Sequence, residues 1–345
     1  MLQTTLKEHL QRGAEDLPNG IALASLLLEI ADCSKNIAHL IAEGALSQVT
    51  AKLATTNVQG ETQMQLDVLS NDLFIASLDQ SGVVAGAVSE ELDAPYLFKA
   101  QKTAPFIVAF DPLDGSSNVA VNGTVGSIFC ILPSKNLSHR QDEDHTQYLQ
   151  AGNAQVAAGY VLYGPATMLV LTIGKGTHAF TLDAKSQNFL LTHENIQIPE
   201  TPEFAINASN QRFWEPPIKR YVTECCEGLT GVRERDFNMR WVASMVADVH
   251  RILMRGGVYL YPKDTKLPAR VGRLRLLYEA NPMSFIVEQA GGKSSTGRER
   301  ILELQPNQIH ERVPVVIGSH AEVSLIELYH QEFDVHLLEA YSLST

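Results

Sequence analysis

The chain contains 345 residues, of which 45% are apolar and 19% are charged, so its composition excludes wholesale disorder. Its formal net charge of −12 argues against broad binding to nucleic acid or to an anionic membrane, although a few local cations could still hold a small anionic ligand. The four cysteines form no CxxC pair with histidine partners, and the vicinal Cys225 and Cys226 are unsuited to a disulfide. We therefore expect a reducing, cytoplasmic compartment and no structural zinc.

Helices are predicted near the N-terminus. The first 20 residues are polar and carry both charge signs, unlike a secretory signal or a transit peptide. The most apolar run, residues 21–30, is too short to span a bilayer. Apolar residues at helical spacing predict helices over residues 21–43 and 66–78, and the polar, aperiodic residues 50–64 are interpreted as a loop.

Short apolar runs bounded by turn residues predict buried strands in the middle of the chain. They cover residues 83–88, 106–110, 127–132, 160–163, 168–173 and 177–182. A Gly-Pro turn joins the fourth and fifth runs as a hairpin. The polar, proline-containing residues 195–202 are interpreted as a linker that divides the chain into domains of residues 1–195 and 196–345.

Strands and helices alternate again in the second half. Strands are predicted over residues 204–207, 258–261 and 313–317, and helices near 216–226, over 239–255 and at the C-terminus. A further helix is expected to begin with Asn281 as N-cap and Pro282 as its first residue. The alternation predicts an α/β or mixed α+β fold in two domains.

The most specific chemical feature is Asp111-Pro112-Leu113-Asp114-Gly115-Ser116-Ser117, directly after the predicted strand 106–110. Two carboxylates at this spacing can converge on a divalent cation, with the Leu113 carbonyl as a further oxygen ligand. Gly115, Ser116 and Ser117 offer N–H and hydroxyl groups to a phosphate. Alone, such a motif is more often an ordinary turn.

A second acidic group, Ser89-Glu90-Glu91, follows the predicted strand 83–88. We expect it at the same edge of the sheet as Asp111 and Asp114, because ligands bind at the carboxyl ends of strands. Four carboxylates suffice for a two-metal phosphoryl-transfer site, and Mg²⁺ suits them because it prefers oxygen ligands.

Together, Glu90-Glu91 and the Asp111 to Ser117 motif resemble the lithium-sensitive, metal-dependent sugar-phosphatase superfamily. The wider chain is similar to one branch of it, the class I fructose-1,6-bisphosphatases, whose layered fold alternates helices and sheets. The matching stretches are residues 66–72, 245–251, 257–262 and 274–283, in the order and spacing of the family.

The resemblance implies the metal chemistry. Glu90, Asp111, Asp114, Glu279 and the Leu113 carbonyl would bind two or more Mg²⁺ ions, with Mn²⁺ as an alternative. Glu91 and Asp67 match carboxylates that help to activate the attacking water. Glu61 matches an acidic ligand of a further metal and completes the catalytic set. Without the resemblance, Asp67 would be interpreted as a polar residue of an amphipathic helix.

The resemblance also implies a sugar-bisphosphate site. Its residues are Asp114, Gly115, Ser116, Ser117, Asn207, Arg240, Trp241, Tyr259, Leu260, Tyr261 and Arg273. The cations Lys263, Lys266, Arg270, Arg273 and Arg275 lie between Tyr261 and Glu279, which favours phosphate binding over a solvated charged face. The family usually has Lys at position 273 and Tyr at 241. Arg273 keeps the charge, whereas Trp241 loses a hydroxyl, so affinity is affected more than reaction type.

Arg240 is expected near the start of the helix 239–255, where a phosphate is favoured. It matches an arginine that reaches the 6-phosphate of the neighbouring subunit. The resemblance therefore implies a homo-oligomer, a tetramer.

The expected activity is hydrolysis of the 1-phosphate of fructose 1,6-bisphosphate to fructose 6-phosphate and phosphate, as in gluconeogenesis. Sedoheptulose-1,7-bisphosphatase activity, alone or as a second activity of the Calvin cycle, needs the same metal chemistry and stays open. An inositol-monophosphatase activity would leave the basic phosphate site without a purpose. The intact carboxylate set argues against a non-catalytic nucleotide-responsive protein, and no GxGxxG supports a dehydrogenase.

The family's usual AMP site is expected to be absent. Its Thr-Gly-Glu-(Leu/Met)-Thr turn is replaced by Gly20-Ile21-Ala22-Leu23-Ala24. Its Lys-Tyr pair falls on Pro105-Phe106, and a further arginine falls on Pro133. The redox loop of the chloroplast form is absent too, because residues 134–158 contain no cysteine.

Overall fold

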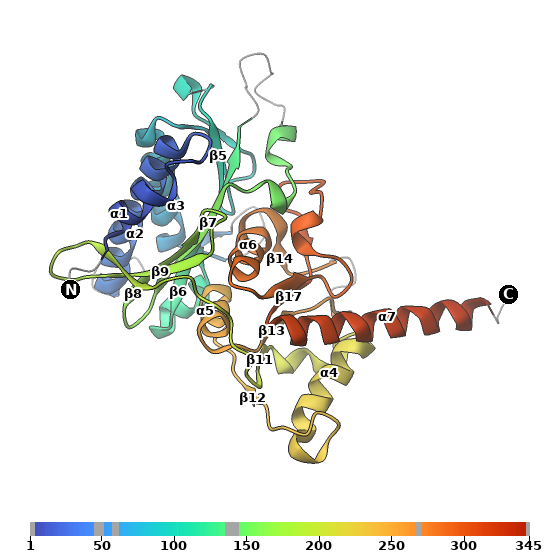
Figure 1. Cartoon of the computed structure of the whole chain (residues 1–345). Coiled ribbons are helices and arrows are strands. Elements are labelled where there is room, and N and C mark those ends of the chain that lie inside the picture. The colour runs from blue at the N-terminus through green and yellow to red at the C-terminus, as the bar shows by residue number, and fades with distance from the viewer. Residues whose placement is uncertain are drawn as a thin grey trace.

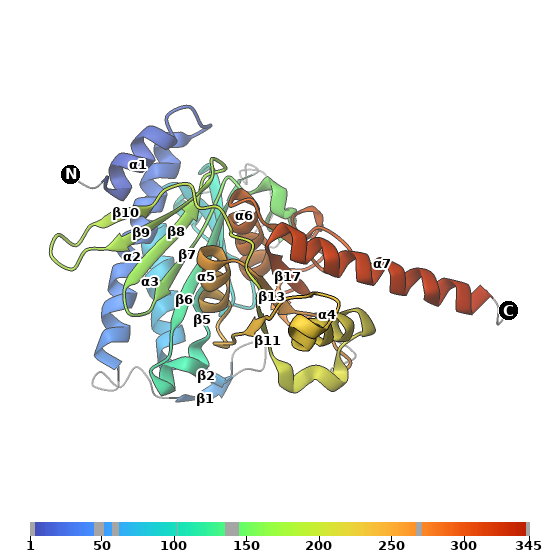
Figure 2. The ribbon, with the colours of Figure 1, turned by 60° about the horizontal axis from the view of Figure 1, so that its bottom comes forward.

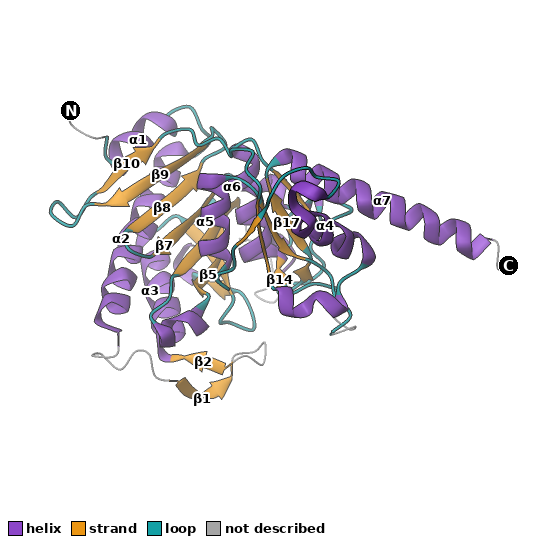
Figure 3. Ribbon diagram, turned by 90° about the horizontal axis from the view of Figure 1, so that it is seen from below, coloured by secondary structure: helices purple, strands orange, loops and turns teal. Residues whose placement is uncertain are grey.

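Two β-sheets alternate with three layers of helices in this computed structural model, as Figures 1 and 3 show. The structure describes residues 4–44, 52–56, 62–101, 103–134, 145–266 and 271–342. One outer layer consists of α1 (Leu6–Gly13), α2 (Gly20–Glu43) and α3 (Gln65–Ser81). The middle layer contains α5 (Met245–Arg255) and α6 (Asn281–Gln289), and the other outer layer contains α4 (Pro216–Glu227) and α7 (His320–Ser342). This confirms the expected mixed α/β architecture.

The larger sheet has eight strands in the order β10-β9-β8-β7-β6-β5-β3-β4. Their bounds are β3 (Val84–Ser89), β4 (Tyr96–Leu97), β5 (Phe106–Asp114), β6 (Val125–Pro133), β7 (Ala157–Tyr163), β8 (Thr167–Thr172), β9 (Thr177–Leu182) and β10 (Phe189–His193). Only β3 and β5 are paired in parallel within this sheet, and its other pairs are antiparallel. The carboxyl ends of β3 and β5 therefore meet at one edge, as the sequence predicts for the two acidic groups.

The smaller sheet has five strands in the order β12-β11-β13-β17-β15. Their bounds are β11 (Glu203–Ile206), β12 (Asn238–Met239), β13 (Val258–Tyr261), β15 (Lys293–Ser295) and β17 (Val315–Gly318). Two short ribbons complete the described strands: β1 (Lys52–Thr56) with β2 (Thr62–Met64), and β14 (Leu274–Arg275) with β16 (Arg312–Val313).

The two faces of the large sheet belong to different apolar cores. Alternate residues such as Val108 and Phe110 pack on α2 and α3, whereas Ile107 and Ala109 pack in the core that contains α5 and α6. Because strand side chains alternate in direction, both faces are buried and the strands read as continuous apolar runs. The far face of the small sheet packs on α4 and α7. Figure 2 shows the C-terminal end of α7 extending beyond the body of the molecule.

The structure corrects three predictions in the chain's local structure. Residues 52–56 and 62–64 pair as antiparallel strands, although 50–64 was interpreted as loop. The helix predicted over 239–255 begins only at Met245, because Ser244 caps it and Ala243 has a left-handed φ of 66°. Arg240 and Trp241 therefore lie before the helix, so the prediction that a helix start favours phosphate binding at Arg240 is wrong.

The third correction concerns Asn281, which is not an N-cap. Its φ and ψ are −62° and −52°, and a π-helical turn, Leu276–Ala280, precedes it directly. The helical path thus begins one turn earlier than the Asn-Pro signal predicts. Helix α1 was not predicted, although Thr5 and Glu8 form a capping box at its start. None of the helices within the described ranges has the length and apolar character needed to cross a bilayer.

Candidate metal and phosphate site

A β-bulge at the end of β5 turns Asp111 and Asp114 toward the same region. Asp111 pairs with Ile128 and Asp114 with Gly126, so three steps along β5 match two steps along β6. In a regular strand, two residues three positions apart have side chains on opposite faces of the sheet. The extra residue of the bulge puts the side chains of Asp111 and Asp114 on the same face. The motif expected as a simple turn is therefore a bulged strand end.

Glu279 completes a buried group of three carboxylates. Oxygen atoms of Asp111, Asp114 and Glu279 all lie within 4.8 Å of one another. Glu279 comes from the π-helical turn before α6, and irregular helical turns of this kind often occur at functional sites. All three residues are at least 93% buried. The structure thus brings together three of the predicted metal ligands from distant parts of the chain.

Glu90, at the end of β3, joins this group through Arg275. The Arg275 guanidinium lies 2.6 Å from the Glu90 carboxylate, and the Arg275 N–H donates to Glu279 at 2.5 Å. Arg275 is 5% exposed, so it is a buried cation beside the carboxylates rather than a surface phosphate ligand. Arg275 belongs to the run of cations that was expected to bind phosphate, and its contact with Glu90 was not predicted.

The pKa values of the clustered carboxylates are raised. Burial and the neighbouring charges of Glu90, Asp114 and Glu279 raise the pKa of Asp111 well above its ordinary value. Burial likewise raises the pKa of Asp114, and it raises the pKa of Glu279 to about 8, against the attraction of Arg275. Four acids with one buried arginine are short of positive charge. The oxygen donors, their number and their repulsion fit a hard divalent cation such as Mg²⁺.

Asp114 also anchors the loop that carries Arg240 and Trp241. One Asp114 oxygen accepts hydrogen bonds from the Ser244 hydroxyl at 2.7 Å and from the Val246 N–H at 2.8 Å. Asp248 holds the same loop, because its carboxylate accepts from the N–H groups of Val242 and Ala243 at 2.9 and 3.2 Å. Burial raises the pKa of Asp248 to about 7. Ser244 and Asp248 were not predicted as site residues. The sequence does indicate Ser244 as an N-cap, because serine is favoured at the position before a helix.

The predicted water-activating carboxylates lie on the neighbouring elements. Asp67 is in the first turn of α3 and 4% exposed, and Glu91 is half-buried after β3. The Ser89 hydroxyl donates to Asn71 at 2.7 Å, which ties the end of β3 to the turn of α3 that follows Asp67. The third predicted carboxylate, Glu61, lies outside the described residues.

Gly115, Ser116 and Ser117 open a short 3₁₀ helix over Ser116–Val121. Gly115 has a φ of 74°, and a Cβ there would lie 2.6 Å from the Ser244 Cβ, so the position requires glycine. Ser117 is exposed, whereas Gly115 and Ser116 are half-buried. The sequence-predicted phosphate loop therefore directly follows Asp114 at the carboxyl end of β5.

The aromatic residues of the predicted sugar site form one group. The Trp241 ring is stacked parallel to Tyr259, with centroids 6.0 Å apart, and its centroid lies 5.8 Å from that of Tyr261. Tyr259 and Leu260 are 1% and 0% exposed, so their side chains belong to the core in this structure. Tyr261 is half-buried, and Asn207 follows β11 with its side-chain oxygen bonded to Ser209.

Two of the basic side chains after Tyr261 are already bonded to neighbouring polar side chains. Arg273 donates to Asp264 at 3.2 Å, and Lys266 donates to Asn210 at 3.3 Å. Arg270 lies outside the described residues. Arg240, by contrast, is exposed, and its guanidinium donates to the Met239 carbonyl at 3.0 Å.

Fold and site together define an α/β protein with a candidate hard-cation site at the carboxyl ends of two parallel strands. Two family models match the chain: "Fructose-1-6-bisphosphatase, N-terminal domain" over residues 4–194 and "Fructose-1-6-bisphosphatase, C-terminal domain" over residues 198–331.

Individual proteins give the same result. The chain is 56% identical to a "Fructose-1,6-bisphosphatase class 1 3" of Methylibium petroleiphilum over 312 residues, covering 90% of this chain and 87% of that protein. It is 54% identical to the "Fructose-1,6-bisphosphatase class 1" of Acinetobacter baylyi, covering 96% and 100%. The holo structure of Leishmania major fructose-1,6-bisphosphatase superposes with a TM-score of 0.89 at 37% identity, covering 96% and 100%. The chain therefore belongs to the class 1 fructose-1,6-bisphosphatase family.

Proposed function

We propose that this chain hydrolyses the 1-phosphate of fructose 1,6-bisphosphate in a Mg²⁺-dependent reaction, giving fructose 6-phosphate and phosphate. The observation that carries the proposal is the buried cluster of Asp111, Asp114 and Glu279, with Glu90 held beside it by Arg275. Its support from relatives is the name shared by proteins 54–56% identical over most of the chain. The corresponding role in the cell is gluconeogenesis.

The proposed metal ligands are Glu90, Asp111, Asp114, Glu279 and the Leu113 carbonyl. Divalent cations bound there would supply positive charge to the phosphate oxygens and lower the pKa of water. We assign Glu91, Asp67 and Glu61 the role of orienting the attacking water and accepting its proton. Their support is their place in the fold: Glu91 directly follows Glu90 after β3, and Asp67 lies in the first turn of α3, which is bonded to the end of β3 through Asn71 and Ser89.

The proposed substrate site extends from the carboxylates toward the small sheet. Asp114 and the N–H and hydroxyl groups of Gly115, Ser116 and Ser117 would hold the 1-phosphate. The sugar and 6-phosphate are assigned to Asn207, Trp241, Tyr259, Leu260, Tyr261 and Arg273, together with Arg240 from a neighbouring subunit. The grouping of Trp241 with Tyr261, and the exposure of Arg240, support this assignment.

We further propose a cytoplasmic homotetramer with two domains, residues 1–195 and 196–345. The domain boundary is supported by the separate sheets and by the ends of the two family matches at residues 194 and 198. The location is supported by the cysteines, all four of which are free thiols.

Product analysis by ³¹P NMR tests the reaction. We expect inorganic phosphate and fructose 6-phosphate to appear from fructose 1,6-bisphosphate in equal amounts when Mg²⁺ is present. Steady-state rates on sedoheptulose 1,7-bisphosphate, measured in parallel, decide between one activity and two. Release of the 6-phosphate instead, or no turnover, would overturn the proposal.

A further inference from the structure

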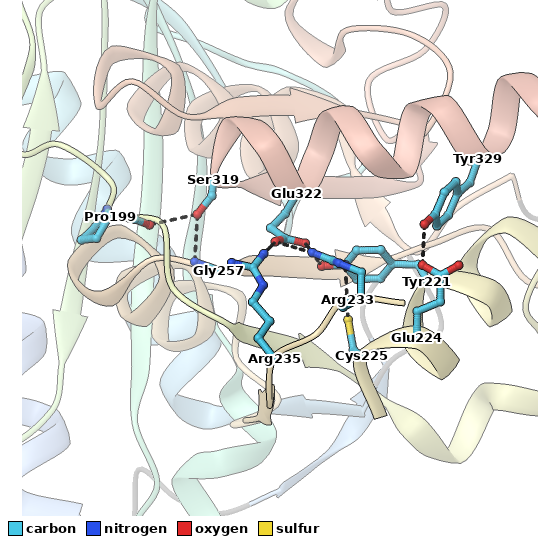
Figure 4. Close-up of polar contacts among 10 residues, drawn as sticks. All are labelled: Pro199, Tyr221, Glu224, Cys225, Arg233, Arg235, Gly257, Ser319, Glu322 and Tyr329. Carbon is cyan, nitrogen blue, oxygen red and sulfur yellow. Dashed lines mark hydrogen bonds and ion pairs between the residues drawn. The ribbon is translucent and has the colours of Figure 1, made fainter. Parts of the chain in front are cut away.

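Glu322 on α7 binds two arginines of the segment that leads to Arg240, as Figure 4 shows. The Arg233 guanidinium donates to both Glu322 oxygens, at 2.7 and 2.8 Å. Arg235 donates to the same carboxylate at 2.5 Å, and the Tyr221 hydroxyl of α4 donates at 2.6 Å. Glu322 is only 4% exposed, so a buried anion joins three separate elements.

The position of Glu322 is itself fixed by the start of α7. Ser319 precedes the helix, and its hydroxyl donates to the Pro199 carbonyl at 3.0 Å and accepts from the Gly257 N–H at 2.9 Å (Figure 4). Glu322 lies in the first turn that follows. The carboxylate is therefore attached to a helix end that is bonded to the small sheet and to the linker before it.

We call residues 231–240 the arm. Beyond Glu322, the C-terminal part of the arm is held by the edge of the small sheet, where β12 pairs in parallel with β11. The N–H groups of Asn238 and Arg240 also donate to the Pro202 and Phe204 carbonyls. Phe237 is half-buried against the core that contains α4 and α7, whereas the other apolar side chains of the arm are exposed, Val232 by 73% and Met239 by 43%. A segment with so few buried contacts depends on its polar anchors for a single conformation.

The arginine pair also contacts the ring of Phe237, three residues before Arg240. The guanidinium groups of Arg233 and Arg235 lie 4.7 and 4.9 Å from the Phe237 ring centroid, both within the range of cation–π attraction. Glu322 is thus bonded to both arginines that flank the Phe237 ring, and Arg233 and Phe237 also contact the core of α4. The arm continues from Phe237 directly into β12 and Arg240.

We propose that Glu322 is a positioning residue for substrate binding, which holds the arm in the conformation that presents Arg240 to the 6-phosphate. This inference rests on the proposed function, in which Arg240 binds that phosphate. It predicts that loss of the Glu322 charge weakens substrate binding and leaves the chemical step unchanged, because the carboxylate cluster at β3 and β5 has no described contact with Glu322.

A merely structural role would instead be to join α7 to α4, and Glu224 provides the matched control. Its carboxylate accepts from Arg220 at 2.9 Å and from the hydroxyl of Tyr329 on α7, so it joins the same two helices. Glu224 is 8% exposed, similar to Glu322. It has no described contact with the arm.

The test compares KM and kcat for fructose 1,6-bisphosphate in saturating Mg²⁺. We expect Glu322→Gln to raise KM at least about fivefold with kcat within about twofold of wild type, the pattern of lost uniform binding. Glu224→Gln should leave both constants unchanged. Arg235→Gln removes one half-exposed cation, keeps Glu322 paired with Arg233, and should raise KM less. It also keeps the test open if Glu322→Gln fails to fold.

A double variant tests whether Glu322 acts through Arg240. Arg240→Ala should raise KM, and adding Glu322→Gln should change it little further, because coupled residues are not additive. An unchanged KM in both Glu322→Gln and Arg235→Gln would overturn the inference. So would effects on KM that multiply in the double variant, or a KM change in Glu224→Gln equal to that in Glu322→Gln. A wild-type chain without activity on the bisphosphate would instead overturn the proposed function.

Discussion

The guanidinium of Arg275 lies 2.6 Å from the carboxylate of Glu90, and its main-chain N–H is bonded to Glu279. The cation therefore lies between two of the proposed metal ligands, from β3 and from the π-helical turn. Both side chains of the Arg275–Glu90 pair are at least 90% buried. The buried cation therefore offsets part of the mutual repulsion of the carboxylates.

Arg275→Gln should destabilise the metal-free protein by about 3–5 kcal/mol, since removing one partner leaves buried charge unpaired. Excess Mg²⁺ should restore part of this loss by supplying positive charge at the same cluster. Denaturant unfolding with chelator and with Mg²⁺ measures both effects. Arg300→Gln is the control, because its pairs with Glu288 and Glu303 are at the surface and are worth at most about 1 kcal/mol. Equal losses in the two variants would contradict the pairing.

His250 should make the protein less stable in acid. Burial lowers its pKa from 6.5 to about 4, and its Nδ1 lies 2.8 Å from the Tyr160 hydroxyl. The unfolded chain therefore binds the proton more readily than the folded chain. The contribution of neutral His250 to the free energy of unfolding is full above pH 6.5 and is lost as the pH falls through about 4. The total loss is at most about 3 kcal/mol.

The measurement compares the unfolding free energies of wild type and His250→Gln from pH 7 to pH 4. Because the other titrating groups are shared, the difference between the two proteins isolates His250. We expect wild type to lose stability relative to the variant as the pH falls. A difference that stays constant with pH would show that His250 does not titrate in this way.

Arg240 should act across a subunit boundary. Mixing an Arg240→Ala chain with an Asp114→Asn chain should form hybrid oligomers, in which a site with intact Asp114 receives a native Arg240 from its neighbour. Its affinity for the bisphosphate should then recover toward wild type. Titrating the mixing ratio and measuring KM checks this. If the mixtures give only the sum of the two parents, each subunit uses its own Arg240.

AMP should not inhibit through the family's usual site. A cavity of about 300 Å³ lies between α1 and α2, and its lining residues are Leu10, Gln11, Ala14, Glu15, Gly20, Ile21, Ala24, Ser25 and Leu28. The one charged residue of that lining is an acid, Glu15. Phe106 and Pro133, which stand where the family has a tyrosine and an arginine, are paired across β5 and β6 and supply no cation. Each charge-assisted bond missing to a nucleotide phosphate costs roughly 1.5–3 kcal/mol.

A titration of AMP against activity at subsaturating fructose 1,6-bisphosphate measures this directly. Inorganic phosphate at equal concentrations is the control, because it reports competition at the active site alone. Half-inhibition at micromolar AMP would reveal a nucleotide site built from other residues.

The sequence predicted the strands on which the carboxylates lie, because β3 and β5 are buried on both faces and read as unbroken apolar runs. It did not predict that Asp111 and Asp114 lie on the same side of β5. That outcome depends on the bulge, which is set by the pairing of β5 with β6 rather than by local preference.

The start of α5 was misplaced for a related reason. Trp241 and Val242 extend the apolar periodicity of the helix, yet Trp241 is stacked on Tyr259 and the Val242 N–H is bonded to Asp248. Contacts with distant residues thus outweighed the local pattern. Likewise, the pairing of Arg275 with Glu90 depends on the folded chain, and a run of cations gives no sign of which one is buried.

The central claim is that the buried carboxylates hold the metal on which sugar-bisphosphate hydrolysis depends. Phosphate release from fructose 1,6-bisphosphate, measured with Mg²⁺ and with chelator for wild type, Asp114→Asn and Glu90→Gln, tests it most directly. We expect activity in wild type only with Mg²⁺, and a kcat at least ~10²-fold lower in each variant, because each weakens charge stabilisation worth several kcal/mol. Wild-type kcat in either variant, or full activity in chelator, would contradict the claim.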